Sequence, residues 1–186
     1  MEESCRVAGL SLVPFKDKRP RVHPSAYVDP GARLAGDVEI GPRCAVLFGA
    51  ALRGDDEPVR VLEGSVVLEQ CLIEAPEGHP VTIGPGALIS HCATVHGAVV
   101  EEGALVGIGA IVLDGAVVGR EAIVGAGAVV LPGTVIEPRS LVVGVPAKVV
   151  RGVTKEEVEG VRKEIERVLE KASVYRAYFE RRGGSL

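Results

Sequence analysis

The sequence predicts an all-β fold, a parallel β-helix of hexapeptide repeats with one amphipathic α-helix packed along it at the C-terminal side. Two observations support this prediction. An aliphatic residue recurs every six positions through most of the chain, and in the second half a small residue follows four positions after each one. Beyond Arg151 the apolar residues take the spacing of an amphipathic helix. The 186 residues are enough for one domain with its own core.

The first observation is a run of twenty hexapeptides, each starting with Val, Leu or Ile. A period of six fits neither a helix nor an alternating strand. It fits short strands joined by tight turns, with the aliphatic side chain pointing inward and Gly or Pro at the turns. Such units bury apolar surface only against their neighbours, which gives a parallel β-helix. The repeats start at Val22, Val28, Leu34, Ile40, Val46, Leu52, Val61, Val67, Ile73, Ile83, Ile89, Val95, Val100, Val106, Val112, Val118, Val124, Val130, Ile136 and Val142.

The regular spacing is interrupted after Leu52, after Ile73 and after Val95. Long insertions in a solenoid become loops on one face, often the functional face. The pattern resembles the hexapeptide-repeat superfamily, and this resemblance implies that three hexapeptides form one triangular, left-handed coil. We expect the left-handed β-helix domain to span residues 1–153.

The second observation is the helical pattern near the C-terminus. Thr154 and Glu157 form a capping box, which marks the start of a helix. We expect a helix over about residues 154–182, inside a C-terminal segment 154–186 that lies along the β-helix. A coiled-coil helix or a helix that binds a partner is the alternative. The apolar face consists of Val158, Val161, Ile165, Val168, Leu169 and Ala172.

Composition excludes several classes of function. Lys and Arg number 21 against 25 Asp and Glu, so the net charge of −4 offers no general basic face for nucleic acid or an anionic membrane. Aromatic residues make up only 3%, which argues against base-stacking platforms, and no apolar run approaches the roughly 18 residues of a membrane helix. The acidic start at Met1 is unlike a signal peptide, and the four cysteines lack CxxC spacing, so we expect a cytoplasmic protein with reduced thiols.

Three polar residues occupy equivalent places in successive coils. Arg53, Glu74 and His96 each directly follow an inward aliphatic residue, and these aliphatic residues are three hexapeptides apart. They are predicted to form one column, with neighbours roughly 4.8 Å apart at the backbone. Arg53 would supply a cation suited to an oxyanion such as bicarbonate. Asp55 is placed to orient Arg53, although the two could instead form an intersubunit salt bridge.

His91 lies one hexapeptide before His96 and one step later in its unit, so it points from a different side of the prism. One chain does not easily bring His91 to Glu74 and His96, whereas two chains of a threefold oligomer do, edge to edge. Two imidazoles and a carboxylate suit Zn, Fe or Co. Three protein ligands leave an open position for a water, whose pKa the metal lowers towards about 7.

The remaining histidines and two of the cysteines have simpler interpretations. His23 and His79 are expected at the surface or in a loop, with His79 as a substitute metal ligand in the alternative. Cys71 and Cys92 are interpreted as small residues at the corners of neighbouring coils. A disulfide or a thiol at the metal site is the alternative for this pair.

These residues resemble the gamma-class carbonic anhydrase family of the same superfamily, over about residues 12–182. The resemblance rests on the RGDDEP segment at 53–58, the GHPVTIG segment at 78–84 and the HCATVHG segment at 91–97. It implies a homotrimer with Zn or Fe(II) at each subunit interface, and reversible hydration of CO2 by a metal-bound hydroxide. It also assigns His91 and His96 as two of three histidine ligands, His91 reaching across to the neighbour. Arg53 then lies near the bicarbonate site, with Asp55 as its salt-bridge partner.

The chain departs from the family at the other site positions. Glu74 stands where the family has its first histidine ligand, so Glu74, His91 and His96 form the expected metal set. Val66 and Leu68 replace an Asn and a Gln, and neither can hydrogen-bond a hydroxide or bicarbonate. Glu69 replaces an Asp and is placed to orient His91, one coil away. A carboxylate ligand makes the metal less Lewis-acidic, so we expect CO2 hydration to be weak or lost.

Two other functions remain open from the sequence. A hexapeptide acyltransferase or thioesterase would use His96 or His91 as a base on a CoA substrate. A non-catalytic trimer would act as a scaffold or bind a ligand, since some relatives carry the label ferripyochelin-binding protein. Saturable CoA binding selects the first alternative, and an intact trimer that binds neither metal nor CoA selects the second.

Overall fold

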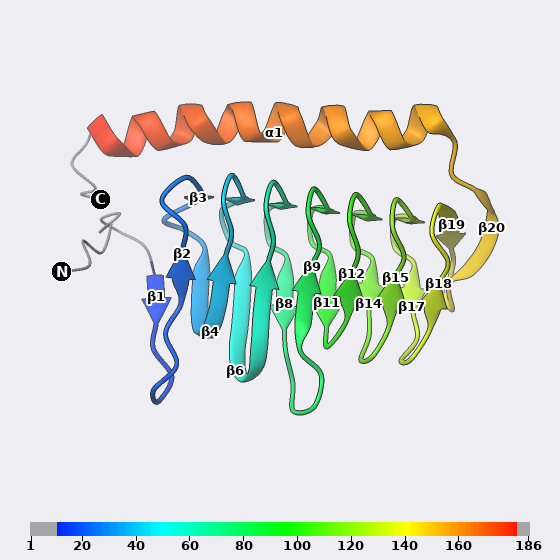
Figure 1. Cartoon of the computed structure of the whole chain (residues 1–186), viewed down its shortest axis with the longest axis horizontal. Helices are drawn as coiled ribbons and strands as arrows, with labels where there is room; N and C mark the ends of the chain where they lie inside the picture. Colours follow the sequence, from blue (N-terminus) through cyan, green and yellow to red (C-terminus); the bar gives the residue numbers. More distant parts are fainter. Residues whose placement is uncertain (1–10, 182–186) are drawn as a thin grey trace.

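The chain forms a left-handed parallel β-helix of about seven turns with one helix lying along it (Figure 1). The fold is seen in a computed structural model that describes residues 11–181. It confirms the fold class that the repeat predicts. Residues 1–10, the predicted helix end at 182 and the tail to 186 lie outside the described residues, and so does Cys5.

The strands stack into three flat faces of a prism. The first face is an eight-stranded sheet in which all neighbours run parallel except the last pair, β19 and β20. This face lies beneath the helix. Its strands are β3 (Tyr27–Val28), β5 (Ala45–Val46), β7 (Val66–Val67), β10 (Leu88–Ile89), β13 (Leu105–Val106), β16 (Ile123–Val124), β19 (Ser140–Val143) and β20 (Lys148–Gly152).

The second and third faces are joined into one twelve-stranded sheet, because β4 (Arg33–Ile40) and β6 (Ala51–Val61) bend through the corner between them. The second face holds the site described below, and β1 extends it by pairing with the first half of β4. Its strands are β1 (Ser11–Val13), β8 (Leu72–Glu74), β11 (Thr94–His96), β14 (Ile111–Val112) and β17 (Val129–Val130). The third face consists of β2 (Arg21–Val22), β9 (Val81–Ile83), β12 (Val99–Val100), β15 (Val117–Val118) and β18 (Val135–Ile136).

The core of the prism is the column of aliphatic residues that start the hexapeptides. Every one of them except Val22 is at most 4% exposed, which confirms the inward direction that the repeat predicts. Small residues fill the corners because a larger side chain would collide with the neighbouring coil. The alanines at 104, 110, 116, 122 and 128 are fully buried there.

Two of the three interruptions of the repeat lie at one edge of the prism. The nine-residue step after Leu52 stays inside β6, whose two halves pair with β8 on one side of the corner and β9 on the other. The ten-residue step after Ile73 forms the loop between β8 and β9, which projects below the coils in Figure 1. Both excursions therefore lie beside the edge where the second face meets the third.

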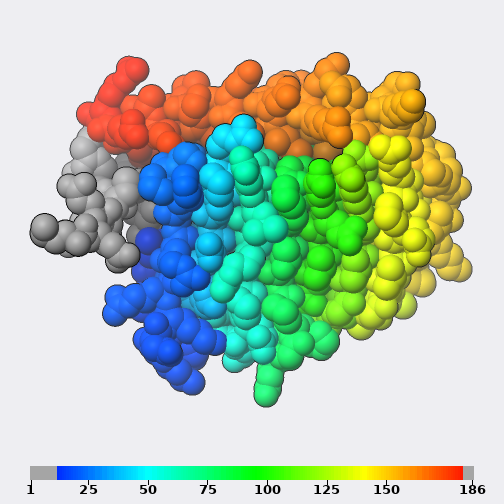
Figure 2. All heavy atoms as spheres, in the orientation of Figure 1, coloured from blue at the N-terminus to red at the C-terminus, as the bar shows by residue number. Residues whose placement is uncertain are grey.

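The helix α1 (Lys155–Arg181) covers the first face along its whole length, as the orange-to-red spheres of Figure 2 show. The predicted capping box is present, with Glu157 N–H donating to Thr154 Oγ1 and Thr154 N–H donating to a Glu157 carboxylate oxygen. The buried helix residues Val161, Ile165 and Val168 pack on the outward side chains of the first face. No helix among residues 11–181 combines the length and the apolar character that crossing a bilayer requires.

Candidate functional site

Arg53, Glu74 and His96 form the predicted column at the edge between the second and third faces. Arg53 of β6 is the register partner of Glu74 in β8, and Glu74 is the partner of His96 in β11. A Glu74 carboxylate oxygen, Oε1, contacts the Arg53 guanidinium and lies 3.9 Å from His96 Nε2. The carboxylate thus stands between a cation and an imidazole.

The bend of β6 after Arg53 is held in place from two sides. Asp55 Oδ2 lies 3.4 Å from Arg53 Nη1, which is the contact that the sequence predicts between these two residues. Lys18 Nζ donates to the backbone carbonyl oxygens of Asp55 and Asp56, at 2.7 Å each. Gly36 has a φ of +73°, and a Cβ there would lie 2.4 Å from the carbonyl oxygen of Gly54, so only glycine lets β4 approach β6 this closely.

Glu69 and His91 form a second column at the other edge of the second face, where it meets the first face. The amide of Cys92 donates to the Glu69 carbonyl, which stacks the two coils in this register. Glu69 Oε2 lies 2.6 Å from His91 Nδ1, as expected for a carboxylate that orients this imidazole. The oxygen is buried and no aligned hydrogen bond reaches it.

The structure does not bring His91 to Glu74 and His96 within one chain. The chain turns at His91 and Cys92, crosses the second face as β11, and reaches His96 at its other edge, so the two imidazoles lie at opposite edges of this face. Among residues 11–181, no three His, Cys, Asp or Glu side chains gather closely enough to hold a metal ion. The two edges can meet only if a second chain supplies one of them.

Asp114 is a site residue that the sequence did not predict. Its Oδ1 makes a short hydrogen bond with His96 Nδ1 across one coil. Strand register could have indicated this contact. Because β11 pairs with β14, Leu113 lies beside His96, and Asp114 is the next residue along the chain. The signal was weak because the step from Val95 to Val100 breaks the six-residue count.

The donors at the two edges fit a divalent metal of the Zn, Fe(II) or Co type. Each imidazole has a carboxylate at Nδ1, from Asp114 for His96 and from Glu69 for His91. Metal-binding histidines commonly present one nitrogen to the metal while the other contacts a carboxylate. Glu74 supplies a carboxylate beside His96 Nε2, and its second oxygen remains available while Oε1 contacts Arg53.

Val66 and Leu68 are buried on the first face, and Leu68 lines the same groove as His91. Their residues are 0% and 5% exposed, and they pack with Val161 and Ile165 of α1 on the first face. Neither carries a hydrogen-bonding side chain that could reach a bound hydroxide or bicarbonate.

The other predicted residues are found at simpler positions. His23 is exposed and pairs with a serine hydroxyl, and His79 is exposed in the loop after β8. Cys44, Cys71 and Cys92 are all free, so the disulfide alternative for Cys71 and Cys92 is wrong. Burial raises the pKa of the Cys71 thiol to about 12, which opposes a role as a metal thiolate. The corner assignment is right for Cys71 and wrong for Cys92, which is exposed while Ala93 fills the corner.

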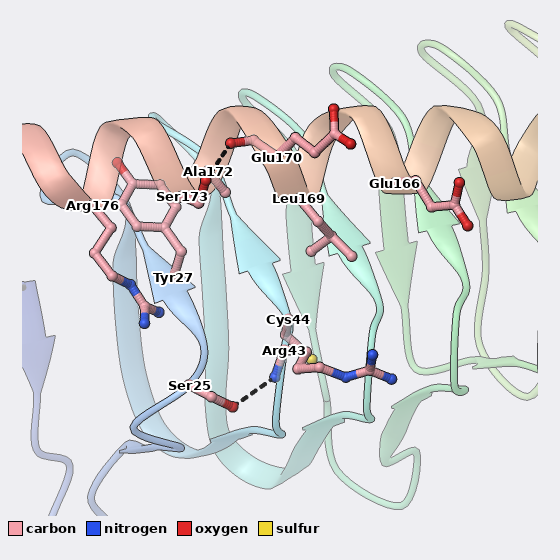
Figure 3. Close-up of a pocket in the computed structure, with 10 residues that line it drawn as sticks. All are labelled: Ser25, Tyr27, Arg43, Cys44, Glu166, Leu169, Glu170, Ala172, Ser173 and Arg176. Atoms are coloured by element: carbon pink, nitrogen blue, oxygen red, sulfur yellow. Dashed lines mark hydrogen bonds between the residues drawn. The ribbon is translucent and has the colours of Figure 1, made fainter.

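Several hollows border the helix in the described part of the chain. A largely apolar groove of about 520 Å³ lies between α1 and the first face, and His91, Leu105 and Gly160 are among its lining residues. A pocket of about 510 Å³ lies between the last part of α1 and the first coils (Figure 3). None of the predicted site residues lines the second pocket, and both of its arginines have partners. Arg43 pairs with Glu63 at 3.0 Å, and Arg176 donates to the carbonyl of Ala26.

Comparison with known proteins identifies the relatives of the chain, although no protein-family model matches it. It is 43% identical over 148 residues to “Probable carbonic anhydrase” of Methanocaldococcus jannaschii, covering 80% of this chain and 93% of that protein. It is 33% identical over 171 residues to “Carbonic anhydrase” of Geobacillus kaustophilus, covering 92% and 94%. It is also 37% identical over 149 residues to “Carnitine operon protein CaiE” of Escherichia coli O157:H7, covering 80% and 76%.

Solved structures show the same fold. A Bacillus cereus protein described as a “putative acetyltransferase” superposes with a TM-score of 0.90 at 30% identity, covering 92% of this chain and 99% of that one. A hexapeptide transferase family protein from Anaplasma phagocytophilum gives a TM-score of 0.84 at 30% identity, covering 90% and 98%. The fold and the repeat thus define a hexapeptide-repeat protein. Within this class, the chain belongs to the gamma-carbonic-anhydrase-like family.

Proposed function

We propose that the protein is a gamma-carbonic-anhydrase-like trimeric metalloprotein with slow reversible CO2 hydration. Glu74 and His96 of one chain, with His91 of a neighbouring chain, hold the metal. One observation carries the proposal: the two imidazoles lie on opposite edges of one face, each with a carboxylate at its Nδ1. Two relatives named as carbonic anhydrases support the same reaction.

The apolar character of the second face and its edges supports the trimer. Leu72 in the middle of this face is 41% exposed. Phe48, two residues after β5, and Ile108, two residues after β13, are 46% and 56% exposed along the His91 edge. A threefold arrangement joins the His91 edge of one chain to the His96 edge of the next, and it covers these side chains.

In this arrangement the residues of the chain have separate roles. A bound divalent metal supplies a hydroxide near neutral pH by lowering the pKa of its water. Arg53 binds the oxyanion product through its guanidinium, which Asp55 holds at Nη1 while Glu74 contacts Nη2. Glu74 adds negative charge at the metal and engages Arg53, so both the Lewis acidity and the anion site are weakened.

The absent hydrogen-bond partners slow the reaction further. Val66 and Leu68 offer no donor or acceptor, and the loss of one well-placed donor typically lowers a rate about 10²-fold.

The free thiols of Cys44, Cys71 and Cys92 fit a reducing compartment, so we place the protein in the cytoplasm.

Metal content per chain tests the proposal. The protein is purified without chelator or added metal, beside His91→Ala and a matched His23→Ala control, and molar mass is measured by light scattering. We expect about one metal per chain in a trimer, lost in His91→Ala and kept in His23→Ala. A trimer without metal that takes up neither Zn, Fe(II) nor Co would exclude the metal site and with it the anhydrase function.

Acyl transfer is the second candidate, and the groove beside His91 favours it. This groove is largely apolar, and its volume of about 520 Å³ suits an acyl chain ending near an imidazole base. The structure with a TM-score of 0.90 carries an acetyltransferase description. Calorimetric titration with CoA and acetyl-CoA distinguishes the two functions, because saturable binding that weakens in His91→Ala selects acyl transfer.

A further inference from the structure

We propose that Asp114 is a positioning residue for His96. It accepts a hydrogen bond from His96 Nδ1–H, and it thereby fixes the tautomer in which Nε2 is unprotonated and faces Glu74. This inference rests on the proposed function, in which His96 binds a metal through Nε2. A nitrogen that binds a metal must carry a lone pair and no proton. The contact between His96 and Asp114 itself lies within one chain.

The geometry gives each nitrogen of the His96 ring a different neighbour. Asp114 Oδ1 is hydrogen-bonded to Nδ1, and Glu74 Oε1 lies 3.9 Å from Nε2 on the other side. The His96 and Asp114 side chains are 31% and 38% exposed, so the pair is partly shielded from water. A carboxylate accepts hydrogen bonds and donates none when ionised, so Nδ1 must carry the proton.

Gly97 is what lets Asp114 reach the ring. Its φ is +60°, and a Cβ at this position would lie 2.7 Å from Asp114 Oδ1 and 2.7 Å from His79 Cβ. The turn is fixed by Gly97 N–H donating to the Glu74 carbonyl and by Gly115 N–H donating to the Gly97 carbonyl. The carboxylate therefore sits in a space that a side chain at position 97 would fill, between His96 and the loop that carries His79.

The chemical consequence is a reversal of the ordinary preference of imidazole. A neutral histidine side chain in water favours the tautomer with its proton on Nε2. In that tautomer Nε2 has no lone pair with which to bind a metal. A carboxylate at Nδ1 draws the proton to that nitrogen and raises the basicity of the other. Glu69 Oε2 lies 2.6 Å from His91 Nδ1, although no aligned hydrogen bond joins these two atoms.

Nitrogen-15 NMR of the metal-free full chain tests the tautomer directly, at a pH where the histidine rings are neutral. The His96 signals are assigned by their loss in His96→Gln. We expect the Nδ1–H form in the wild type and the Nε2–H form in Asp114→Ala. Asp114→Asn should keep the wild-type form because its amide oxygen still accepts, and Glu137→Ala serves as an exposed carboxylate control. An Nε2–H ring in the wild type, or a ring that Asp114→Ala leaves unchanged, overturns the inference.

Metal affinity supplies the second measurement. Removal of such a partner typically weakens metal binding 10- to 100-fold, so Asp114→Ala should raise the dissociation constant for Co²⁺ or Zn²⁺ by about that factor. Asp114→Asn should stay within a few-fold of the wild type, with the oligomeric state unchanged in both. An unchanged affinity in Asp114→Ala overturns the positioning role. If the wild type binds no metal, the proposed function fails, and the tautomer alone decides whether Asp114 orients the ring.

Discussion

Glu74 shares one carboxylate between two neighbours, and this sharing has a chemical consequence. In the described structure its Oε1 contacts Arg53 while facing His96 Nε2. In the proposed site, a metal bound through the second oxygen would share this carboxylate with the guanidinium. The same contact occupies Arg53, whose free guanidinium suits a bicarbonate oxyanion. Under the proposed function both effects lower activity, and both arise from one residue type at one position.

Replacing Glu74 by histidine should therefore increase CO2 hydration. Glu74→His removes a negative charge from the metal and releases Arg53 for the oxyanion, so we expect a rise of order 10²-fold, the typical effect of one well-placed donor. Stopped-flow measurement of CO2 hydration at equal metal loading checks this, with Glu77→His in the neighbouring loop as control. An equal or lower rate in a metal-loaded trimer would show that Glu74 is not what limits the reaction.

At the same scale, the column was predictable and Asp114 was not. Arg53, Glu74 and His96 each follow an inward aliphatic residue, so counting hexapeptides places them on adjacent strands, and the register confirms it. Asp114 reaches His96 only because the chain turns at Gly97 with a positive φ and leaves no Cβ in the way. That contact depends on a turn conformation rather than on the period of the repeat.

At the scale of elements, α1 is fastened to the β-helix by a buried carboxylate as well as by its apolar face. Glu121, which is 5% exposed, accepts from Arg139 Nε at 2.6 Å and from Arg162 of α1 at 3.0 Å. The hydrogen bond from Arg139, supported by the charges of Arg120 and Arg162, lowers the pKa of Glu121 below its usual 4.5. The ionised carboxylate therefore links the helix to two coils.

Glu121→Gln should destabilise the protein by roughly 1–3 kcal/mol at neutral pH, as expected when charged hydrogen bonds are weakened at a buried group. Because the folded pKa is lowered, the contribution of Glu121 is present above pH 4.5 and is lost as pH falls through the folded pKa. Urea unfolding at about pH 7 and about pH 3 should show the gap between variant and wild type narrowing in acid. A gap that is equal at both pH values contradicts this, and Glu137→Gln is the exposed control.

The helix itself was predictable because its signals are local. The capping box at Thr154 and Glu157 and the apolar spacing from Val158 onwards depend on residues within a few turns of each other. The hydrogen bond between Arg162 and Glu121 was not predictable, since these residues are 41 positions apart in the sequence. Helices and strands can be predicted from local sequence patterns. The contacts that attach the helix to the β-helix depend on which side chains the folded chain brings together.

At the scale of the whole molecule, the repeat determines the prism, and the exposed side chains of the second face favour its assembly. The same local rule acts in every coil, which is why the sequence alone predicts the fold. The six-residue repeat describes contacts between coils of one chain and does not describe contacts between chains. His91 and His96 lie at opposite edges of one face, so the proposed function depends on that assembly.

A charge in the middle of the second face should therefore abolish the trimer and the metal together. Leu72 is 41% exposed within β8, and in the trimer Leu72→Arg would bury an unpaired cation, at a cost of several kcal/mol. We expect a folded monomer with less than about a tenth of the wild-type metal, by light scattering and metal analysis. Val135→Arg is the matched control, because Val135 is 63% exposed on the third face. A Leu72→Arg trimer with full metal content would place the interface elsewhere. A Leu72→Arg monomer that keeps its metal would mean that one chain holds the ion alone, without the His91 edge of a neighbour.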